Sequence, residues 1–290
     1  MKVNLKLLKR LYLINHPSEH EEDMISFILN YCYKIPKLTF HLDHYNNLFI
    51  TKNTTNPIQY ACVVAHMDTV HEFRFTRELI MSNNTIRARY SNSKIPCGLN
   101  ADDCNGILVA LQLLETLPDL KVCFTVEEEM GGEGAEQASL NTEFFSDVQF
   151  LIQADRRGSR DFIIHTNGIT TASDDFVDDV LELLIKYDYE LAMGTFTDVG
   201  ILTENLEISG VNVSCGYYNE HTTRECCRVK ELENCLNFIH DVIVSLSGNG
   251  KVYYIDVPKV TTNTTTYPSE ELPCDHCRTF DCMNCTKYPD

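Results

Sequence analysis

The sequence contains no tryptophan and no long hydrophobic run, and basic residues are scarce compared with acidic ones. Among 290 residues, Lys and Arg together number 24, whereas Asp and Glu number 42, which gives a formal net charge of −18 at pH 7. A membrane-spanning helix needs about 20 consecutive apolar residues, so we expect no membrane partner. A nucleic-acid-binding surface needs clustered Lys and Arg, so we expect no nucleic-acid partner either.

The N-terminal segment lacks the features of a signal peptide. Residues 1–16 (MKVNLKLLKRLYLINH) have neither a continuous apolar stretch nor a small-residue cleavage site, and we expect an amphipathic helix there. The chain has 13 cysteines, of which nine are scattered through expected strands and helices and four are grouped near the C-terminus. This distribution is typical of a reducing compartment, and we predict a cytoplasmic location.

Strand and helix signals alternate through most of the chain. Ser18 and Glu21 form a capping-box pattern before the apolar periodicity of 24–35, which predicts a helix that begins near Ser18. The other expected helices are 103–117, 174–186 and 229–246, and the expected strands are 38–42, 47–52, 60–65, 121–126, 149–154, 162–166 and 211–217. Helices that separate strands favour an α/β fold, with a mostly parallel mixed sheet covered by helices on both faces.

The composition changes after about residue 247. Residues 260–273 (VTTNTTTYPSEELP) are polar and Thr-rich and have no core-forming period, which is typical of a linker or an extended arm. We therefore divide the chain into a globular domain, residues 1–247, and a C-terminal extension, residues 248–290.

Residues with metal-binding side chains occur where expected strands end or an expected helix begins. The segments are YACVVAHMDTV (His66, Asp68), CGLNADDCNGI (Asp102, Asp103), FTVEEEMGG (Glu128, Glu129), FLIQADRRG (Asp155) and VNVSCGYYNEHTTRE (His221). Because the carboxyl ends of parallel strands meet at one edge of a sheet, we expect these side chains to converge.

Each segment taken alone also has an ordinary structural interpretation. A His-x-Asp pair is usually a surface pair, and two aspartates before a helix usually provide an N-cap and a first-turn acid. The glutamates would suit a solvated loop, Asp155 would suit an ion pair with a neighbouring arginine, and His221 would suit a structural role. Their joint occurrence in this order favours a functional site.

At these motifs the sequence resembles the co-catalytic di-zinc exopeptidase superfamily. That superfamily includes peptidase T, glutamate carboxypeptidases, acyl-amino-acid deacylases and bacterial leucyl aminopeptidases. The resemblance covers roughly residues 15–245 and rests on HMDTV, NADDCNG, EEEMGGEGA, AD and NEHTTRE. The first three motifs are specific, whereas the last two count mainly through their position. The resemblance implies a zinc exopeptidase-like fold for residues 1–247.

The resemblance also implies the metal ligands. Asp102 would bridge two Zn²⁺ ions, His66 and Asp155 would complete one site, and Glu129 and His221 would complete the other. Imidazole and carboxylate groups suit Zn²⁺, and such sites keep open positions for water and a substrate carbonyl.

The resemblance also implies roles for Asp68 and Glu128 and a cis peptide bond, and it leaves Glu127 without a role in the site. Asp68 would accept a hydrogen bond from the far nitrogen of His66 and fix its tautomer. Glu128 would be the general base and acid, since a carboxylate that binds no metal has to carry the proton from the water to the leaving nitrogen. Glu127 would be solvated or ion-paired, and a cis peptide bond is expected between Asp102 and Asp103.

The spacing leaves no room for an inserted domain. The stretch between Asp155 and His221 is filled by expected strands and a helix, and the stretch between His66 and Asp102 is too short. We therefore expect a single catalytic domain without a lid domain. Relatives with a lid use a lid histidine to bind the oxyanion, a role for which the candidates here are His165, Tyr217 and Tyr218. Asp198, in GTFTDVGIL, would either shape the specificity pocket or cap a helix.

These residues predict a di-zinc metallohydrolase, an amino- or carboxypeptidase-like exopeptidase that cleaves a short peptide or an N-acyl amino acid. Two alternatives remain open, namely a non-peptidase amidohydrolase and a catalytically silent peptide-binding module on the same fold. The exact substrate and the oligomeric state, including a homo-oligomer, also remain open.

The C-terminal cysteines form a separate motif. Cys274, Cys277, Cys282 and Cys285 have the spacing C-x₂-C-x₄-C-x₂-C, which predicts a third, structural Zn²⁺ held by four thiolates. His276 would be able to replace one thiolate. The alternative is a pair of disulfides, which would require an oxidising compartment.

Overall fold

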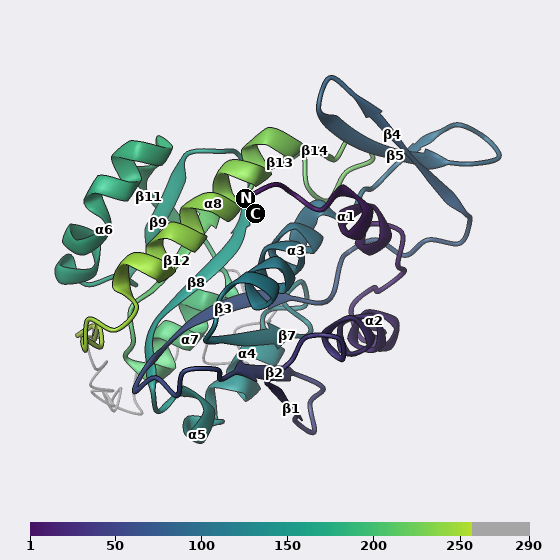
Figure 1. Ribbon diagram of the computed structural model, residues 1–290. Coiled ribbons are helices and arrows are strands. Elements are labelled where there is room, and N and C mark those ends of the chain that lie inside the picture. Colours follow the sequence, from purple (N-terminus) through teal and green to yellow (C-terminus); the bar gives the residue numbers. More distant parts are fainter. Residues whose placement is uncertain (257–290) are drawn as a thin grey trace, which may run out of the picture. The chain divides into compact units, whose positions relative to one another are not determined.

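The computed structural model describes residues 1–256, in which a mixed sheet runs through the centre (Figure 1). In spatial order its strands are β1 (Leu38–Leu42), β2 (Leu48–Lys52), β7 (Leu120–Thr125), β3 (Tyr60–His66), β8 (Val148–Arg156), β12 (Gly210–Ser214), β9 (Asp161–Thr166) and β10 (Ile169–Thr170), with β11 (Glu190–Gly194) paired to β9. The central strands β7, β3, β8 and β12 are parallel to one another. The pairs β1–β2, β2–β7 and β12–β9 are antiparallel. The predicted α/β class and the mostly parallel mixed sheet are confirmed. The antiparallel pairs lie toward the edges of the sheet.

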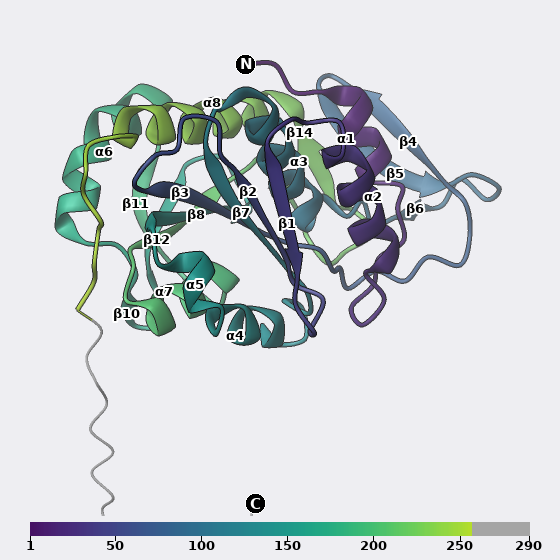
Figure 2. The same ribbon diagram turned by 60° about the horizontal axis from the view of Figure 1, so that its bottom comes forward.

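Helices cover both faces of the sheet, as Figure 2 shows. One face carries α3 (Ala101–Thr116), α6 (Asp174–Tyr187) and α8 (Val229–Leu246), and α1 (Leu5–Leu11) packs on α3. The opposite face carries α4 (Glu133–Ser139), α5 (Thr142–Phe145) and α7 (Asp198–Leu206). The helix α2 (Glu22–Cys32) lies on the same side as α1.

The sequence of β3 shows why this strand is central. All seven of its residues are buried. Val63 and Ala65 belong to the hydrophobic cluster on the α3 side, and Cys62 and Val64 belong to the cluster on the α4 and α7 side. Alternate residues of a strand point to opposite faces, so a strand covered on both faces is apolar throughout. His66 is therefore the first polar residue after a buried apolar run, at the edge where the strand ends.

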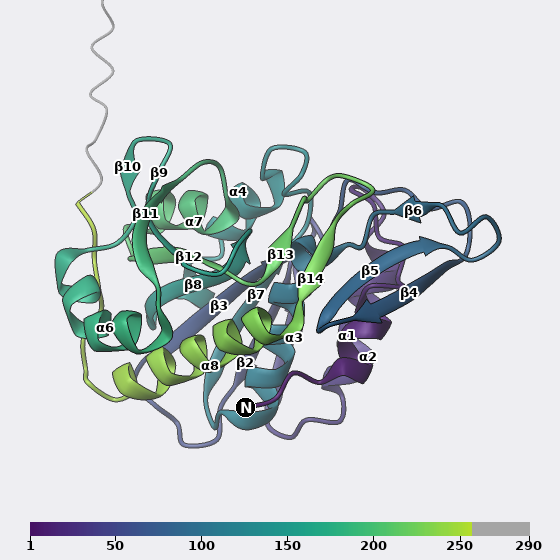
Figure 3. The ribbon, with the colours of Figure 1, turned by 90° about the horizontal axis from the view of Figure 1, so that it is seen from above.

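A second, smaller sheet is made of segments that, apart from Tyr217, the sequence analysis did not identify as strands. It contains β4 (Arg77–Ser82), β5 (Thr85–Tyr90), β6 (Pro96–Cys97), β13 (Tyr217–Tyr218) and β14 (Cys226–Arg228). Figure 3 shows the β4–β5 hairpin beside α1 and α2, with β13 and β14 between it and the main sheet. The stretch between His66 and Asp102 thus contains the β4–β5 hairpin. The loop that holds His221 connects β13 and β14.

Two predicted boundaries are wrong. The helix expected near Ser18 begins at Glu22, and its N-cap, Glu21, makes no side-chain capping bond. The Ser18 hydroxyl instead donates to Asp68 Oδ2 at 2.7 Å, so this side chain is not available to cap the helix. The strand expected over 211–217 ends at Ser214, because Gly216 adopts a left-handed conformation that breaks it, and Tyr217 joins the second sheet.

The described residues form one compact unit. The stretch between Asp155 and His221 supplies strands and helices of this unit, so the expected single domain without a lid is confirmed for these residues. After the end of α8, Tyr253 and Ile255 are buried, so the segment that contains them also packs against this unit. None of the described helices has the length and apolar character needed to cross a bilayer. The C-terminal cysteine motif lies outside the described residues.

Candidate metal centre

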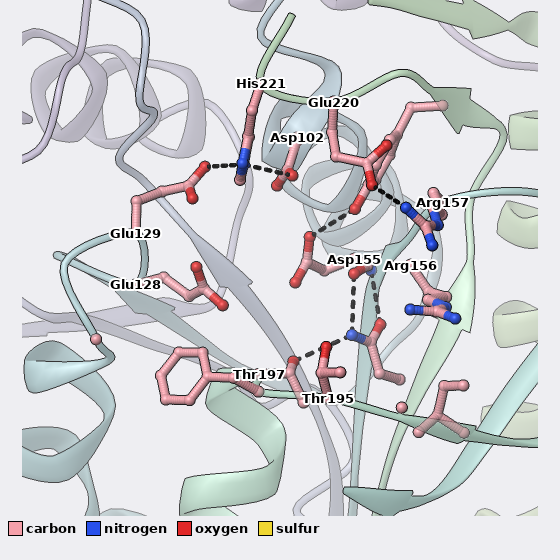
Figure 4. Close-up of a pocket in the computed structure, with 16 residues that line it drawn as sticks. Asp102, Glu128, Glu129, Asp155, Arg156, Arg157, Thr195, Thr197, Glu220 and His221 are labelled. Atoms are coloured by element: carbon pink, nitrogen blue, oxygen red, sulfur yellow. Dashed lines mark hydrogen bonds and ion pairs between the residues drawn. The ribbon is translucent and has the colours of Figure 1, made fainter. Parts of the chain in front are cut away.

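The five predicted ligands come together at one edge of the main sheet. His66 is the last residue of β3, Asp155 lies near the end of β8, and Glu129 follows β7. Asp102 is in the first turn of α3, and His221 lies in the loop between β13 and β14. Figure 4 shows the His221 ring between the carboxylates of Glu129 and Asp102, with Asp155 beside them.

The distances divide the ligands into two groups that share Asp102. His66 Nε2 lies 3.0 Å from Asp102 Oδ1 and 3.7 Å from Asp155 Oδ1. His221 Nε2 lies 3.3 Å from Asp102 Oδ2 and 2.9 Å from Glu129 Oε1. The two oxygens of Asp102 thus face different histidines, which is the arrangement that a bridging carboxylate requires.

Asp68 connects the two predicted catalytic segments. His66 Nδ1 lies 3.1 Å from Asp68 Oδ1, so a proton on Nδ1 leaves Nε2 free to bind a metal. The same carboxylate accepts the backbone N–H groups of Glu128 at 3.0 Å and Glu129 at 3.1 Å. Burial opposes its charge, but the hydrogen bonds, chiefly that from His66, hold the pKa of Asp68 below its usual range. Asp68 therefore positions His66 and the glutamate loop relative to each other.

Glu225 is a site residue that the sequence analysis missed. Its side chain is 1% exposed and accepts four backbone N–H groups. Oε2 accepts from Leu99 at 2.7 Å and Asn100 at 3.0 Å, and Oε1 accepts from Ala101 at 2.6 Å and Asp102 at 3.2 Å. This one carboxylate therefore fixes the backbone that leads into Asp102. The expected cis peptide bond between Asp102 and Asp103 is also present.

Asp155 is held by polar neighbours on the adjacent strands. Asn212 Oδ1 accepts from the Asp155 backbone N–H at 3.0 Å, and Asn212 Nδ2 donates to the Asp155 carbonyl at 2.9 Å. The Tyr217 hydroxyl donates to Asp155 Oδ1 at 3.3 Å. Burial, together with the charge on Asp102, raises the pKa of Asp155 to about 8.

The glutamate loop makes a tight turn under the pocket. Gly132, at φ 73°, donates its N–H to the carbonyls of Glu127 and Glu128, each at 3.1 Å. A Cβ at Gly134 would lie 1.9 Å from the Val126 carbonyl oxygen, so a side chain there would displace the loop. Glu127, expected to be solvated or ion-paired, accepts the Tyr45 hydroxyl at 2.7 Å.

Glu128 faces the pocket beside Glu129 (Figure 4). A carboxylate oxygen of Glu128 lies within 4.8 Å of ligand atoms of both His66 and Glu129. Burial raises the pKa of Glu128 to about 10. His66, Glu128 and Glu129 therefore form a further compact group that could hold a metal ion, which makes Glu128 a candidate ligand as well.

The donor set fits a pair of zinc ions. With Zn–N and Zn–O bonds of about 2.0–2.2 Å, ligand atoms at neighbouring corners of a tetrahedron lie about 3.3–3.6 Å apart. Within the two ligand groups that share Asp102, the four distances between a histidine nitrogen and a carboxylate oxygen are 2.9–3.7 Å. Hydrogen bonds to Asp102 and Glu129 raise the pKa of His221 to about 11. The carboxylates around His221 thus favour a neighbouring positive charge, which two divalent cations would supply.

Asp103 is a competing carboxylate, since the compact group of potential metal ligands that contains both His66 and Asp155 has Asp103, not Asp102, as its third member. Its Oδ1 accepts the Gly106 N–H at 2.8 Å and its Oδ2 accepts the His66 N–H at 3.3 Å. Asp102 lines the pocket, whereas neither Asp103 nor His66 does. Both oxygens of Asp103 thus accept backbone N–H groups, whereas those of Asp102 face the two histidines.

The residues considered for oxyanion binding and for the specificity pocket lie at the margin of the ligand cluster or outside the pocket. Of the three residues considered for the oxyanion, Tyr217 alone lines the pocket, and the Tyr218 hydroxyl donates to Glu231 at 2.6 Å. Asp198 is the first residue of α7, whose N-cap is Thr197. Asp198 is buried and accepts the Thr125 hydroxyl, and burial raises its pKa to about 7. It neither caps the helix nor lines the pocket.

Comparisons with known proteins identify relatives through structure. No protein-family model and no curated protein sequence matches the chain. A tripeptidase from Staphylococcus aureus subsp. aureus Mu50 has a similar structure, with 15% identity, a TM-score of 0.68, and coverage of 82% of this chain and 96% of the tripeptidase. The aminopeptidase PepT from Bacillus cereus ATCC 10987 is 14% identical, with a TM-score of 0.70 and coverage of 83% and 97%.

The TET1 peptidase of Pyrococcus horikoshii, which assembles into a tetrahedron or a large octahedral shell, is also similar. It is 15% identical, with a TM-score of 0.61 and coverage of 82% of this chain and 98% of the peptidase. At such identities the likeness establishes the fold. The chain therefore has the fold of these peptidases, as the sequence motifs predicted.

Proposed function

We propose that this chain is a zinc-dependent exopeptidase that hydrolyses the peptide or amide bond of short peptides or N-acyl amino acids. The observation that carries this proposal is the position of Asp102, whose two carboxylate oxygens face His66 on one side and His221 on the other. The peptidase fold of the structural neighbours supports the same reaction class.

Each ligand group would hold one Zn²⁺, with Asp102 shared between them. His66 and Asp155 would complete one site, and Glu129 and His221 would complete the other. When bound, two zinc ions lower the pKa of a water and polarise the carbonyl of the substrate. Asp68 keeps the Nε2 atom of His66 available, and Asn212 fixes the backbone of Asp155.

Glu128 would move the proton. Its carboxylate is not part of either ligand group around Asp102, yet it lines the same pocket. It would accept a proton from the attacking water and deliver it to the leaving nitrogen, which is the work of a general base and acid. A neighbouring divalent cation stabilises the ionised carboxylate, so metal binding would lower the pKa of Glu128 from its raised value.

The size of the pocket suits a small substrate. Its volume of about 340 Å³ lies near the lower end of the range of roughly 300–1,000 Å³ for small-molecule sites. The polar side chains of Thr195, Thr197, Asn212 and Tyr217 line it beside the acidic cluster (Figure 4). A folded protein would not present a peptide bond in such a pocket, whereas a short peptide would.

The test is hydrolysis of short substrates by zinc-loaded protein. We expect cleavage within a panel of dipeptides, tripeptides and N-acyl amino acids, and loss of cleavage after zinc removal and in Asp102→Asn. Binding of these compounds without cleavage would identify a silent binding module. Cleavage that survives both zinc removal and Asp102→Asn would contradict the proposed chemistry.

Two further assignments concern the chain as a whole. We place it in the cytoplasm, a proposal supported by nine free, buried cysteines among the described residues. We also propose that Cys274, Cys277, Cys282 and Cys285 bind a structural Zn²⁺, a proposal that rests on their spacing alone.

A further inference from the structure

The strand β1 forms one edge of the main sheet. Among the described strands it pairs with β2 alone, so its other side has no strand partner there (Figure 2). Four of its five residues are exposed, including Phe40 at 37% and Leu42 at 44%. A free edge of this kind presents unpaired N–H and C=O groups to any strand that approaches it.

The hydrogen bonds at the two ends of β1 show which backbone groups point outward. The Asn53 N–H donates to the Lys37 carbonyl at 3.2 Å, and the Asp43 N–H donates to the Asn47 carbonyl at 3.1 Å. Hydrogen-bonded and non-hydrogen-bonded pairs alternate along antiparallel strands. The odd-numbered residues of β1 are therefore bonded to β2, whereas the even-numbered residues direct their N–H and C=O groups away from the sheet.

This edge lacks the features that usually protect an exposed strand. Such strands carry charged residues or proline, or they contain a bulge. The sequence of β1, LTFHL, contains no proline, lysine, arginine or carboxylate, and its pairing with β2 is regular. The strand β11, which pairs only with β9, has an irregular register between Ala192 and Met193, and Arg160 binds its first residue, Glu190, at 2.5 Å. The β1 edge is thus open to a partner strand.

The sequence of β1 is nearly symmetric about Phe40, which suits pairing with a second copy. Antiparallel pairing about a two-fold axis at Phe40 places the two Phe40 residues opposite each other, and Leu38 of each copy opposite Leu42 of the other. These are the residues with outward backbone groups, so each pair can exchange two hydrogen bonds. Their side chains share one face, where aromatic and aliphatic cross-strand pairs stabilise the strands. A two-fold interface requires such self-complementarity.

The charges that flank β1 are complementary in the same register. Lys37 precedes the strand and Asp43 follows it, so pairing centred on Phe40 brings Lys37 of each copy opposite Asp43 of the other. Lys37 is exposed, and two backbone N–H groups of the turn after β1 hold the Asp43 carboxylate in place. The net charge of −18 opposes association of copies in general, but residues 33–43 contain two lysines and one aspartate. This edge therefore escapes the general repulsion.

We propose that β1 is a dimerisation edge, at which two copies of this chain pair antiparallel about a two-fold axis at Phe40. The main sheet is then continuous through the dimer. Tyr33, which is 79% exposed, stacks on Phe40 with ring centroids 6.0 Å apart and adds apolar surface to the contact. No residue of β1 lines the metal pocket, so the dimer forms whether or not the proposed hydrolytic function is correct.

The test is sedimentation of the full-length protein over a range of concentrations, in a reducing buffer that prevents crosslinking by cysteine. One pair of short strands is a small interface, so we expect a monomer–dimer equilibrium with a Kd of roughly 1–100 μM. Phe40→Lys should raise Kd at least about tenfold, because like charges directly opposite destabilise a strand pair. Ile185→Lys is the matched control, since Ile185 is a 74% exposed apolar residue on α6 and the change in charge is the same.

A change of charge at the end of the strand tests the register. Lys37→Glu places like charges opposite each other at two symmetric contacts and should raise Kd roughly three- to tenfold at low salt, with a smaller effect at high salt. Lys34→Glu is the control, because the same register places Lys34 opposite the uncharged Asn46, outside the paired strands. An equal rise in Kd for both variants contradicts the proposed register.

Amide hydrogen exchange locates the interface on the strand. The N–H groups of Leu38, Phe40 and Leu42 should exchange more slowly when the concentration rises from below to above Kd. The N–H groups of Thr39 and His41, which are bonded to β2, should keep the same exchange rates. This alternation distinguishes strand pairing from a dimer that merely covers the face of the sheet.

Three outcomes would overturn the proposal. The first is a protein that stays monomeric at every concentration while the even-numbered amides of β1 exchange rapidly. The second is a dimer with the same Kd in Phe40→Lys and Ile185→Lys, which would place the interface elsewhere. The third is slow exchange of the even-numbered amides in a monomer, which would show that another segment of the same chain covers β1. The melting temperature of each variant shows whether it is folded.

Discussion

Replacement of Glu225 by glutamine should loosen the loop that carries Asp102. The side chain keeps its size, but one carboxylate oxygen becomes an NH₂ group. Each oxygen accepts two backbone N–H groups, from Leu99 and Asn100 or from Ala101 and Asp102. Whichever oxygen is replaced, two buried donors lose their acceptor and face another donor.

The expected cost follows from the number of bonds lost. A hydrogen bond to a charged group contributes about 1.5–3 kcal/mol, so the loss of two reduces the free energy of unfolding by about 3–6 kcal/mol. A domain of this size loses about 2–4 °C in Tm per kcal/mol. We therefore expect Tm of the metal-free Glu225→Gln protein to fall by at least about 6 °C. Displacement of Asp102 should also weaken zinc binding about 10- to 100-fold.

The assay combines thermal unfolding with zinc competition against a chromophoric chelator. Glu190→Gln is the control, since Glu190 forms an exposed ion pair with Arg160 at 2.5 Å, and such pairs contribute about 0–1 kcal/mol. The reasoning is refuted if Glu225→Gln matches this control in both Tm and zinc affinity.

Three other substitutions test separate parts of the site. Glu128→Gln should keep both zinc ions and lower kcat at least about 100-fold, as loss of a general base does; loss of one zinc ion would make Glu128 a ligand instead. Asp68→Asn should weaken zinc binding about 10- to 100-fold in a chelator competition, and unchanged affinity would argue against its positioning role. The double variant Cys274→Ser with Cys277→Ser should lose one zinc ion per chain by elemental analysis at nearly constant kcat; unchanged zinc content would rule out a thiolate site.

The convergence of the candidate ligands was predictable from the sequence because the fold places strand ends by a simple rule. His66 and Asp155 each come at the end of a buried apolar strand, and such strands are recognisable from sequence. Their parallel pairing then brings the ends to one edge. Asp102 and Glu129 follow the same logic at a helix start and after a strand. Strand ends and residue types therefore predicted that these side chains converge, whereas the role of each one was implied by the family resemblance.

The β4–β5 hairpin of the second sheet was not predicted, because the sequence signal of its turn is weak. The hairpin of β4 and β5 turns on Asn83 and Asn84, both at positive φ, in a two-residue connection. Asparagine at positive φ is typical of such hairpin turns, so the signal was present but weaker than that of Asn-Gly. Ser18 was misinterpreted because a sequence pattern cannot show that its hydroxyl is bonded to Asp68, 50 positions away.

The role of Glu225 was not apparent from its motif. Glu225 is the last residue of NEHTTRE, but the motif does not show that its side chain is buried and binds backbone N–H groups. Its carboxylate oxygens accept backbone N–H groups from a loop more than 120 positions earlier in the chain. Every residue type except proline has such an N–H group, so the sequence of that loop does not reveal the contact. A glutamate four residues after a candidate ligand is equally compatible with a solvated position. Its burial, which comes from tertiary packing, is what distinguishes it.

The most direct test of the central claim is the position of zinc in crystals of the reconstituted protein, measured by anomalous scattering at the zinc absorption edge. The account predicts two peaks in the pocket of each chain, one between His66, Asp102 and Asp155 and one between Asp102, Glu129 and His221. A single peak, a peak bound by Asp103 in place of Asp102, or no peak at Asp102 would contradict it.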